Sequence, residues 1–127
     1  MSKKILCIDD DPFYASLYRE ILSRRGFTVE HAFDAASGFD AVKRFGPDLV
    51  TLDVMMPEKK GMLDGYGLLE SLRDHDDYKD LPVVMISALG EESDARRAID
   101  LGASSYIPKQ KLSPDLLVEQ INKYLNS

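Results

Sequence analysis

Short apolar runs alternate along the chain with segments of helical periodicity. The apolar runs are 5–8, 27–32, 49–52, 83–86 and 105–107. Continuous apolar runs are typical of strands buried on both faces, whereas alternation of apolar and polar residues is typical of an edge strand. Only the run 27–32 alternates. The pattern therefore predicts five strands, with the second at an edge of the sheet.

The segments between these runs carry helix start and stop signals. Asp11 and Pro12 combine an N-cap residue with a proline at the first helical position, and Gly26 follows the same segment. We interpret Asp11 as a helix cap with no chemical role. The expected helices run from Asp11 to Gly26, from Asp34 to near Gly46, from about Gly65 through Leu72, from Glu91 to Gly102, and from Ser113 through Leu125.

Alternating strands and helices predict an α/β fold in which right-handed crossovers place helices on both faces of a parallel sheet. The strand order 2-1-3-4-5 puts the alternating second strand at an edge. We therefore expect a doubly wound five-stranded parallel sheet with five helices. A length of 127 residues fits one domain, which we expect to span residues 1–127.

Composition narrows the function classes. With 44% hydrophobic and 30% charged residues, the chain is neither disordered nor a disulfide scaffold. A net charge of −6 argues against direct nucleic-acid binding. The lone Cys7 lies inside an apolar run, where we interpret it as a small buried hydrophobe. We find no signal-peptide core or membrane span and expect a cytoplasmic protein with no membrane partner. His31 and His75 are interpreted as surface residues and not as ligands.

Polar side chains follow four of the five predicted strands, where ligands bind in a sheet of this kind. They are Asp9, Asp10 and Asp11 after the first strand, Asp53 after the third, Ser87 at the end of the fourth and Lys109 after the fifth. Because the first and third strands are neighbours, carboxylates converge at one edge. Clustered carboxylates need a cation or a proton, and an open site of oxygen ligands suits Mg²⁺. With a lysine and a hydroxyl facing them, they can support phosphoryl transfer to a carboxylate nucleophile.

Four segments at these strand ends carry a resemblance to a known family. They read ILCIDDDP at 5–12, DLVTLDVMMP at 48–57, PVVMISAL at 82–89 and GASSYIPK at 102–109. In this order and spacing, the chain resembles a receiver domain of a two-component response regulator over essentially its whole length. The resemblance implies the flavodoxin-like sheet of CheY and its relatives.

The resemblance also implies a role for each site residue. Asp53 resembles the phosphoacceptor. Asp10 resembles a direct Mg²⁺ ligand, Asp9 a neighbour that holds the ion through water, and the backbone carbonyl of Met55 a third ligand. The remaining three are Ser87, which would hydrogen-bond the phosphoryl group, Lys109, which would pair with it, and Tyr106, an aromatic switch residue.

The function implied by the resemblance is a signalling switch. A histidine kinase or a phosphotransfer protein would donate the phosphoryl group. The surface of the fourth helix, fifth strand and fifth helix would then change, and an unknown partner protein would read it. Such a domain is not a classical enzyme, since it catalyses only its own phosphorylation and dephosphorylation. Met55 and Leu89 are both apolar and cannot orient an attacking water, which predicts slow self-dephosphorylation.

The sequence departs from the family pattern at two places. Gln110 stands where the family usually has a proline joined by a cis bond, so either the Lys109–Gln110 bond is trans with a re-routed loop or it is a non-proline cis bond. Between Pro57 and Gly65 the chain carries about four extra residues, within 58–64, beside the expected phosphorylation site. We consider two readings of this insertion: it carries partner specificity or covers Asp53, or it is a tolerated surface insertion.

Three alternatives to the switch stay open from the residues alone. A receiver that is never phosphorylated could serve only as a binding module. A hydrolase of the haloacid-dehalogenase type would use an Asp-x-Asp pair, a spacing that Asp9 and Asp11 share, but it would also need a cap insertion. A flavodoxin-like FMN binder would need a phosphate-binding loop where this chain has three carboxylates.

Overall fold

A computed structural model describes residues 2–56 and 64–126 of the protein. Within these ranges the sheet is parallel and has the order β2-β1-β3-β4-β5, as predicted. The strands are β1 (Lys4–Ile8), β2 (Thr28–Ala32), β3 (Leu49–Leu52), β4 (Val83–Ser87) and β5 (Ser105–Pro108). The helices are α1 (Pro12–Arg24), α2 (Ala35–Phe45), α3 (Gly65–Arg73), α4 (Glu92–Asp100) and α5 (Pro114–Leu125), with a short 3₁₀ helix η1 (Lys109–Lys111) after β5. In the described part of the chain, no helix has the length and apolar character needed to cross a bilayer.

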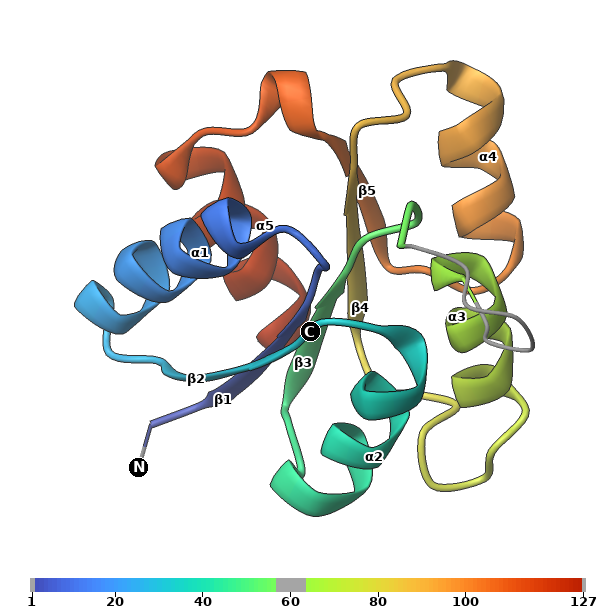
Figure 1. Cartoon of the computed structure of the whole chain (residues 1–127), viewed down its shortest axis with the longest axis horizontal. Coiled ribbons are helices and arrows are strands. Elements are labelled where there is room, and N and C mark those ends of the chain that lie inside the picture. The colour runs from blue at the N-terminus through green and yellow to red at the C-terminus, as the bar shows by residue number, and fades with distance from the viewer. Residues whose placement is uncertain (1, 57–63, 127) are drawn as a thin grey trace.

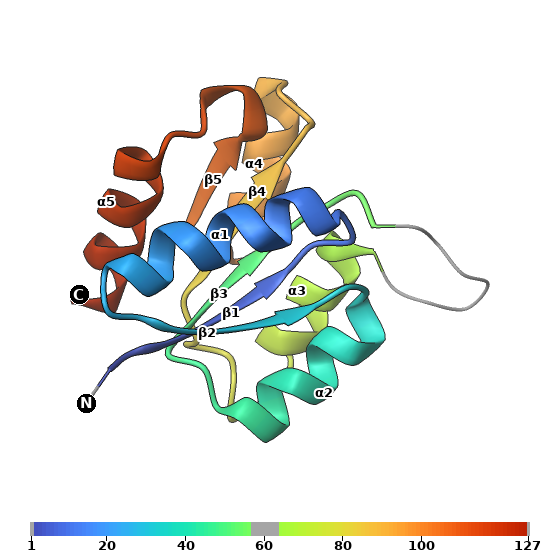
Figure 2. The ribbon, with the colours of Figure 1, turned by 60° about the vertical axis from the view of Figure 1, so that its left-hand side comes forward.

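Helices cover both faces of the sheet. Figure 1 shows α1 and α5 on one side of the strands and α2, α3 and α4 on the other, and the turned view of Figure 2 agrees. Successive strand residues point to opposite faces, so each strand contributes to two apolar layers. In β1, Ile5 and Cys7 pack with α1 and α5, while Leu6 and Ile8 pack towards α2 and α3. The core therefore holds the strands rigidly and leaves their carboxyl ends at one rim.

Burial along the strands agrees with the predicted edge. All four residues of β3 and all five of β4 are buried, whereas Ala32 is the one fully buried residue of β2. His31, predicted to be a surface residue, is only partly exposed: its side chain is half-buried, and its Nε2 atom has no hydrogen-bond partner among the described residues. Burial, with the Arg19 charge adding to it, lowers the pKa of His31 to about 4. The edge strand therefore packs more closely against α1 than its polarity pattern indicated.

Side-chain caps place the helices next to the carboxyl end of the sheet. Asp11 accepts a hydrogen bond from the backbone N–H of Phe13 at 2.9 Å, as its interpretation as a cap predicted. Asp34 caps α2 through Ser37 N–H at 2.8 Å, and Ser113 caps α5 through Leu116 N–H at 3.1 Å. Such caps satisfy backbone donors that a helix leaves unpaired in its first turn. The cap at Asp11 fixes the start of α1 beside Asp9 and Asp10.

Cys7 behaves as the sequence predicted. The side chain is free and fully buried in the layer under α1 and α5. Burial raises the pKa of its thiol to about 12. The thiol therefore stays protonated and acts as a small apolar group.

Candidate functional site

Three carboxylates meet at the carboxyl ends of β1 and β3. Asp9 and Asp53 come directly after these strands, and the parallel register places Ile8 beside Leu52. The backbone N–H of Asp53 donates to the carbonyl of Ile8 at 2.9 Å, which continues the ladder to the site. Asp9, Asp10 and Asp53 each offer an oxygen, and these oxygens all lie within 4.8 Å of one another. The sheet therefore assembles the acidic cluster that the strand ends predicted.

The acidic cluster is largely shielded from solvent and carries several negative charges. Asp9 is 1% and Asp53 4% exposed, while Asp10 is half-buried. Burial raises the pKa of Asp53 to about 6, and the charge of Asp9 adds to this effect. Burial likewise raises the pKa of Asp9. A cation bound by these carboxylates would relieve both effects.

Lys109 supplies one positive charge to this cluster. Its ammonium lies 3.0 Å from Asp9 Oδ2 and donates to Asp53 Oδ2 at 3.2 Å. The side chain is 10% exposed. Burial lowers the pKa of Lys109, but the hydrogen bonds and charges of Asp9 and Asp53 outweigh it, so that the net shift is upward. Lys109 is therefore protonated and bridges the two buried carboxylates.

Gln110 does not displace the lysine. Among residues 2–56 and 64–126 no peptide bond is cis, so the Lys109–Gln110 bond is trans. The chain continues from β5 into η1, an element that the sequence pattern did not predict. The Gln110 amide nitrogen packs so closely over Gly90 that a Cβ atom there would clash with it. This contact ties the loop after β5 to the loop after β4.

Ser87 and Tyr106 lie beside these two loops. Ser87 is fully buried at the end of β4, and its hydroxyl accepts from the backbone N–H of Leu89 at 3.2 Å. The half-buried Tyr106 donates its hydroxyl to the carbonyl of Leu89 at 2.6 Å. Burial raises the pKa of Tyr106, and a hydrogen bond with Ser87 opposes that rise. Ser87, Leu89 and Tyr106 therefore form one connected group.

The chain after Asp53 turns back against the end of β3. Met55 N–H donates to Asp53 Oδ1 at 3.1 Å, and the Met55 side chain is 56% exposed. Gly65, the first residue of α3, donates to the carbonyl of Val54 at 3.1 Å. A Cβ atom at Gly65 would meet the backbone of Asp53 and Val54, so only glycine fits this approach. The predicted insertion falls largely on residues 57–63, outside the described residues.

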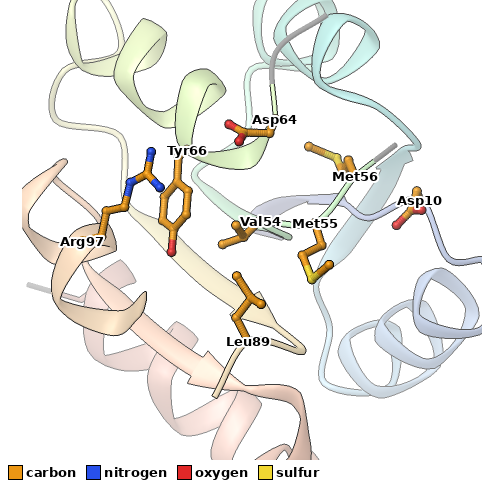
Figure 3. Close-up of a pocket in the computed structure, with 8 residues that line it drawn as sticks. All are labelled: Asp10, Val54, Met55, Met56, Asp64, Tyr66, Leu89 and Arg97. Carbon is orange, nitrogen blue, oxygen red and sulfur yellow. The ribbon is translucent and has the colours of Figure 1, made fainter. Parts of the chain in front are cut away.

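A groove of about 500 Å³ opens beside the acidic cluster. Its lining residues are Asp10, Val54, Met55, Met56, Asp64, Tyr66, Leu89 and Arg97. In Figure 3, Asp10 lies at one end and the Arg97–Tyr66 pair at the other. The Arg97 guanidinium lies 4.2 Å from the ring centroid of Tyr66, whose hydroxyl donates to the carbonyl of Asp94 at 3.1 Å. The groove thus links the carboxylates to α4.

Comparison with known proteins agrees with this geometry. The family model described as "Response regulator receiver domain" matches residues 5–122. The chain belongs to this family. The receiver domain is 35% identical to the chemotaxis protein CheY of Bacillus subtilis over 127 residues, which cover 99% of this chain and all of that protein. It is 38% identical over 123 residues to a probable transcriptional regulator, ycf27, of Porphyridium aerugineum, covering 97% of this chain and 48% of that protein. The receiver domain thus spans about half the length of the first curated relatives it matches.

Solved structures share the fold. The BeF₃-activated N-terminal receiver domain of Klebsiella pneumoniae RstA superposes with a TM-score of 0.87 at 28% identity, covering 98% of this chain and 100% of that one. A CheY-like receiver domain protein from Methanospirillum hungatei gives a TM-score of 0.87 at 25% identity, covering 99% of this chain and 95% of that one. The doubly wound fold predicted from the alternating pattern is therefore confirmed.

Several contacts around the site could not be predicted from the sequence. The Tyr14 ring lies under the Lys109 ammonium, with 3.9 Å from Nζ to the ring centroid. Gly65 and Gln110 make close backbone or side-chain approaches that no spacing rule predicts. A sequence-distant pair such as Tyr14 and Lys109 becomes visible only when α1 is placed beside the end of β5.

Proposed function

We propose that this receiver domain accepts a phosphoryl group on the carboxylate of Asp53 from a phosphohistidine of a histidine kinase or phosphotransfer protein. The observation that carries the proposal is the protonated Lys109, held 3.2 Å from the buried Asp53 and 3.0 Å from Asp9. A carboxylate with its pKa raised to about 6 is still largely ionised near neutral pH and is poorly solvated. Both properties favour nucleophilic attack on phosphorus.

Mg²⁺ fits the donor set of this site. The three carboxylates offer hard oxygen ligands within 4.8 Å of one another. Asp10, Asp53 and the backbone carbonyl of Met55 would hold the ion directly. Asp9 would act through water, because its Oδ1 already accepts from Asp11 N–H at 2.9 Å and its Oδ2 faces Lys109. Mg²⁺ would supply charge neutralisation of the phosphoryl oxygens.

The residues around Asp53 would bind the group as it arrives. An oxygen of Asp53 would form the new bond to phosphorus while the bond from phosphorus to the donor imidazole nitrogen breaks, and the electron pair of that bond would leave with the imidazole. Lys109 would pair with the phosphoryl oxygens instead of the free carboxylate. The Ser87 hydroxyl would turn from its present contact with Leu89 N–H to donate to a phosphoryl oxygen.

Phosphorylation would then be read through Tyr106 and α4. The Tyr106 hydroxyl is bonded to the carbonyl of Leu89, two residues beyond Ser87. A rearrangement of Ser87 would disturb this bond and free the ring to change rotamer. The surface formed by α4, β5 and α5 would change with it, and a partner protein would recognise the new surface.

The test of this proposal is phosphorylation with acetyl phosphate and Mg²⁺, followed by intact mass. We expect the wild type to gain the mass of a single phosphoryl group. The gain disappears when EDTA removes the metal and in Asp53→Ala, whereas Asp40→Ala, which removes an exposed carboxylate on α2, retains it. A wild type that gains no mass, or an Asp53→Ala variant that still does, contradicts the proposal.

Self-dephosphorylation is expected to be slow, because Met55 and Leu89 at the rim of the groove offer no group to orient water. We expect a Met55→Asn, Leu89→Glu double variant to lose its phosphoryl group faster by about tenfold, since each new polar group can position the attacking water. The decay of phosphorylated protein, followed by mass after removal of the donor, measures this. Ile99→Asn, at another exposed apolar residue, should decay as the wild type does. Equal decay of the double variant and the wild type would refute the prediction.

The binding-module alternative rested on Gln110, which could move Lys109 away from the acidic site, and on the insertion within 58–64, which lies largely outside the described residues. Lys109 contacts Asp53 with a trans bond to Gln110, so the first reason for the alternative falls away. The hydrolase alternative needed Asp11 as a second acid, but Asp11 caps α1. The three carboxylates at the carboxyl edge also remain unsuited to a flavin phosphate.

A further inference from the structure

The environment of the Lys109 ammonium includes an aromatic ring as well as two carboxylates. An ammonium carries three donors, and two of its neighbours are Asp9 Oδ2 and Asp53 Oδ2. A further close neighbour is the Tyr14 ring, 3.9 Å from Nζ to the centroid. The negative face of an aromatic ring attracts such a cation. Tyr14 is therefore a third group in contact with the Lys109 ammonium.

The Tyr14 ring is held in place by its own neighbours. It lies in the first turn of α1, whose start is fixed by the Asp11 cap. Phe13 packs edge-on against it, with centroids 5.2 Å apart. The ring of Tyr18, one turn along and 1% exposed, lies 5.9 Å away. The contact with the buried Tyr18 ring restricts the movement of the Tyr14 ring on that side.

The position of the Tyr14 ring matters because two carboxylates, those of Asp9 and Asp53, compete for the Lys109 ammonium. Asp9 Oδ2, at 3.0 Å, is slightly closer to the ammonium than Asp53 Oδ2, at 3.2 Å. A ring face against the ammonium adds an attraction that favours its position between the two carboxylates. A phosphoryl group on Asp53 would therefore meet the lysine already in position.

We propose that Tyr14 is a positioning residue, whose ring face holds the Lys109 ammonium on Asp53 for phosphoryl transfer. This inference rests on the proposed function, since it assigns Tyr14 a role in the same site. The role belongs to the ring and not to the hydroxyl, because the contact is made with the ring face.

The test compares Tyr14→Leu, which removes the ring at similar size, with Tyr14→Phe, which keeps it. We expect Tyr14→Leu to slow phosphorylation by acetyl phosphate by about 3- to 30-fold, and Tyr14→Phe to stay within about twofold of the wild type. Phe33→Leu is the matched control, because Phe33 is an exposed aromatic that stacks on His31. Its rate should be unchanged.

A second pair of measurements separates positioning from a general structural role. In a Lys109→Ala background, Tyr14→Leu should cause no further slowing. Independently of turnover, the ring face should shift the proton resonances of the Lys109 Cε group upfield in the wild type and in Tyr14→Phe, and Tyr14→Leu should abolish the shift.

Each contrary outcome has a distinct meaning. If the wild type takes up no phosphoryl group, the proposed function fails and the role of Tyr14 in it fails too. If the wild type is phosphorylated but Tyr14→Leu matches it, or Tyr14→Phe is as slow as Tyr14→Leu, only the role of the Tyr14 ring is overturned. Unshifted Lys109 resonances in the wild type, or equal slowing by Tyr14→Leu in the Lys109→Ala background, overturn it as well.

Discussion

Gly65→Ala is expected to lower the free energy of unfolding by about 2–4 kcal/mol and to slow phosphorylation sharply. The new methyl group would lie 2.7 Å from the Cα atom of Val54 and would clash with the carbonyl oxygen of Asp53. Backbone at the end of a buried strand cannot move away as a flexible side chain can. Relief of the clash must therefore displace α3 or the segment that carries Asp53.

Chemical denaturation and the rate of acetyl phosphate turnover measure both effects. Gly90→Ala is the matched control, because the atoms nearest to its methyl group would belong to the Gln110 side chain, which can rotate away, and not to backbone. We expect Gly90→Ala to change stability by less than about 1 kcal/mol. If Gly65→Ala proves as stable and as active as Gly90→Ala, the close approach of α3 to the end of β3 is not required.

Asp53→Asn is expected to stabilise the protein in the absence of divalent cations. Burial, with the charge of Asp9 adding to it, raises the pKa of Asp53 from 3.8 to about 6. The folded state therefore holds this proton more tightly than the unfolded state, which adds stability at low pH. That contribution is lost as the pH rises through the interval from 3.8 to about 6. Asparagine never ionises, so at about pH 7 we expect a gain of about 1–3 kcal/mol over the wild type.

Denaturant unfolding between about pH 4 and about pH 7, with EDTA present, measures both the sign and the size of the stability difference between Asp53→Asn and the wild type. The gain should shrink towards zero at about pH 4, where the folded wild type holds the proton. Mg²⁺ should also reduce the stability gain of Asp53→Asn, because the ion binds the folded wild type and stabilises it. Asp40→Asn, at an exposed carboxylate, should change little. An Asp53→Asn variant less stable than the wild type at about pH 7 would show that the cluster is not strained by its own charge.

The five strands and five α-helices could be predicted because each left a local signal, whereas η1 left none. Pro12 after Asp11 marked the start of α1, and the alternation in 27–32 marked the edge strand β2. Apolar runs marked the buried strands. Because the strands are parallel, the polar residues that follow them all lie at the same edge of the sheet. The convergence of Asp9 and Asp53 follows from the pairing of β1 with β3 alone.

The remaining features depend on contacts between distant segments. The burial of His31 depends on the packing of α1 over β2, which its alternating neighbours do not reveal. From Gln110 alone, the Lys109–Gln110 bond could be cis or trans. The structure, in which this bond is trans, decides between the two. Tyr14 and Lys109 are 95 positions apart along the chain (109 − 14), and no periodicity links them.

The most direct measurement of the central claim locates the phosphoryl group on the chain. Borohydride reduces an aspartyl phosphate to homoserine, which survives proteolysis and peptide mass spectrometry. After treatment with acetyl phosphate and Mg²⁺, we predict homoserine at position 53 in the wild type and at no other aspartate. Homoserine at Asp9 or Asp10, or phosphorylation without any reducible aspartate, would contradict the account and assign the chemistry of this site to another residue.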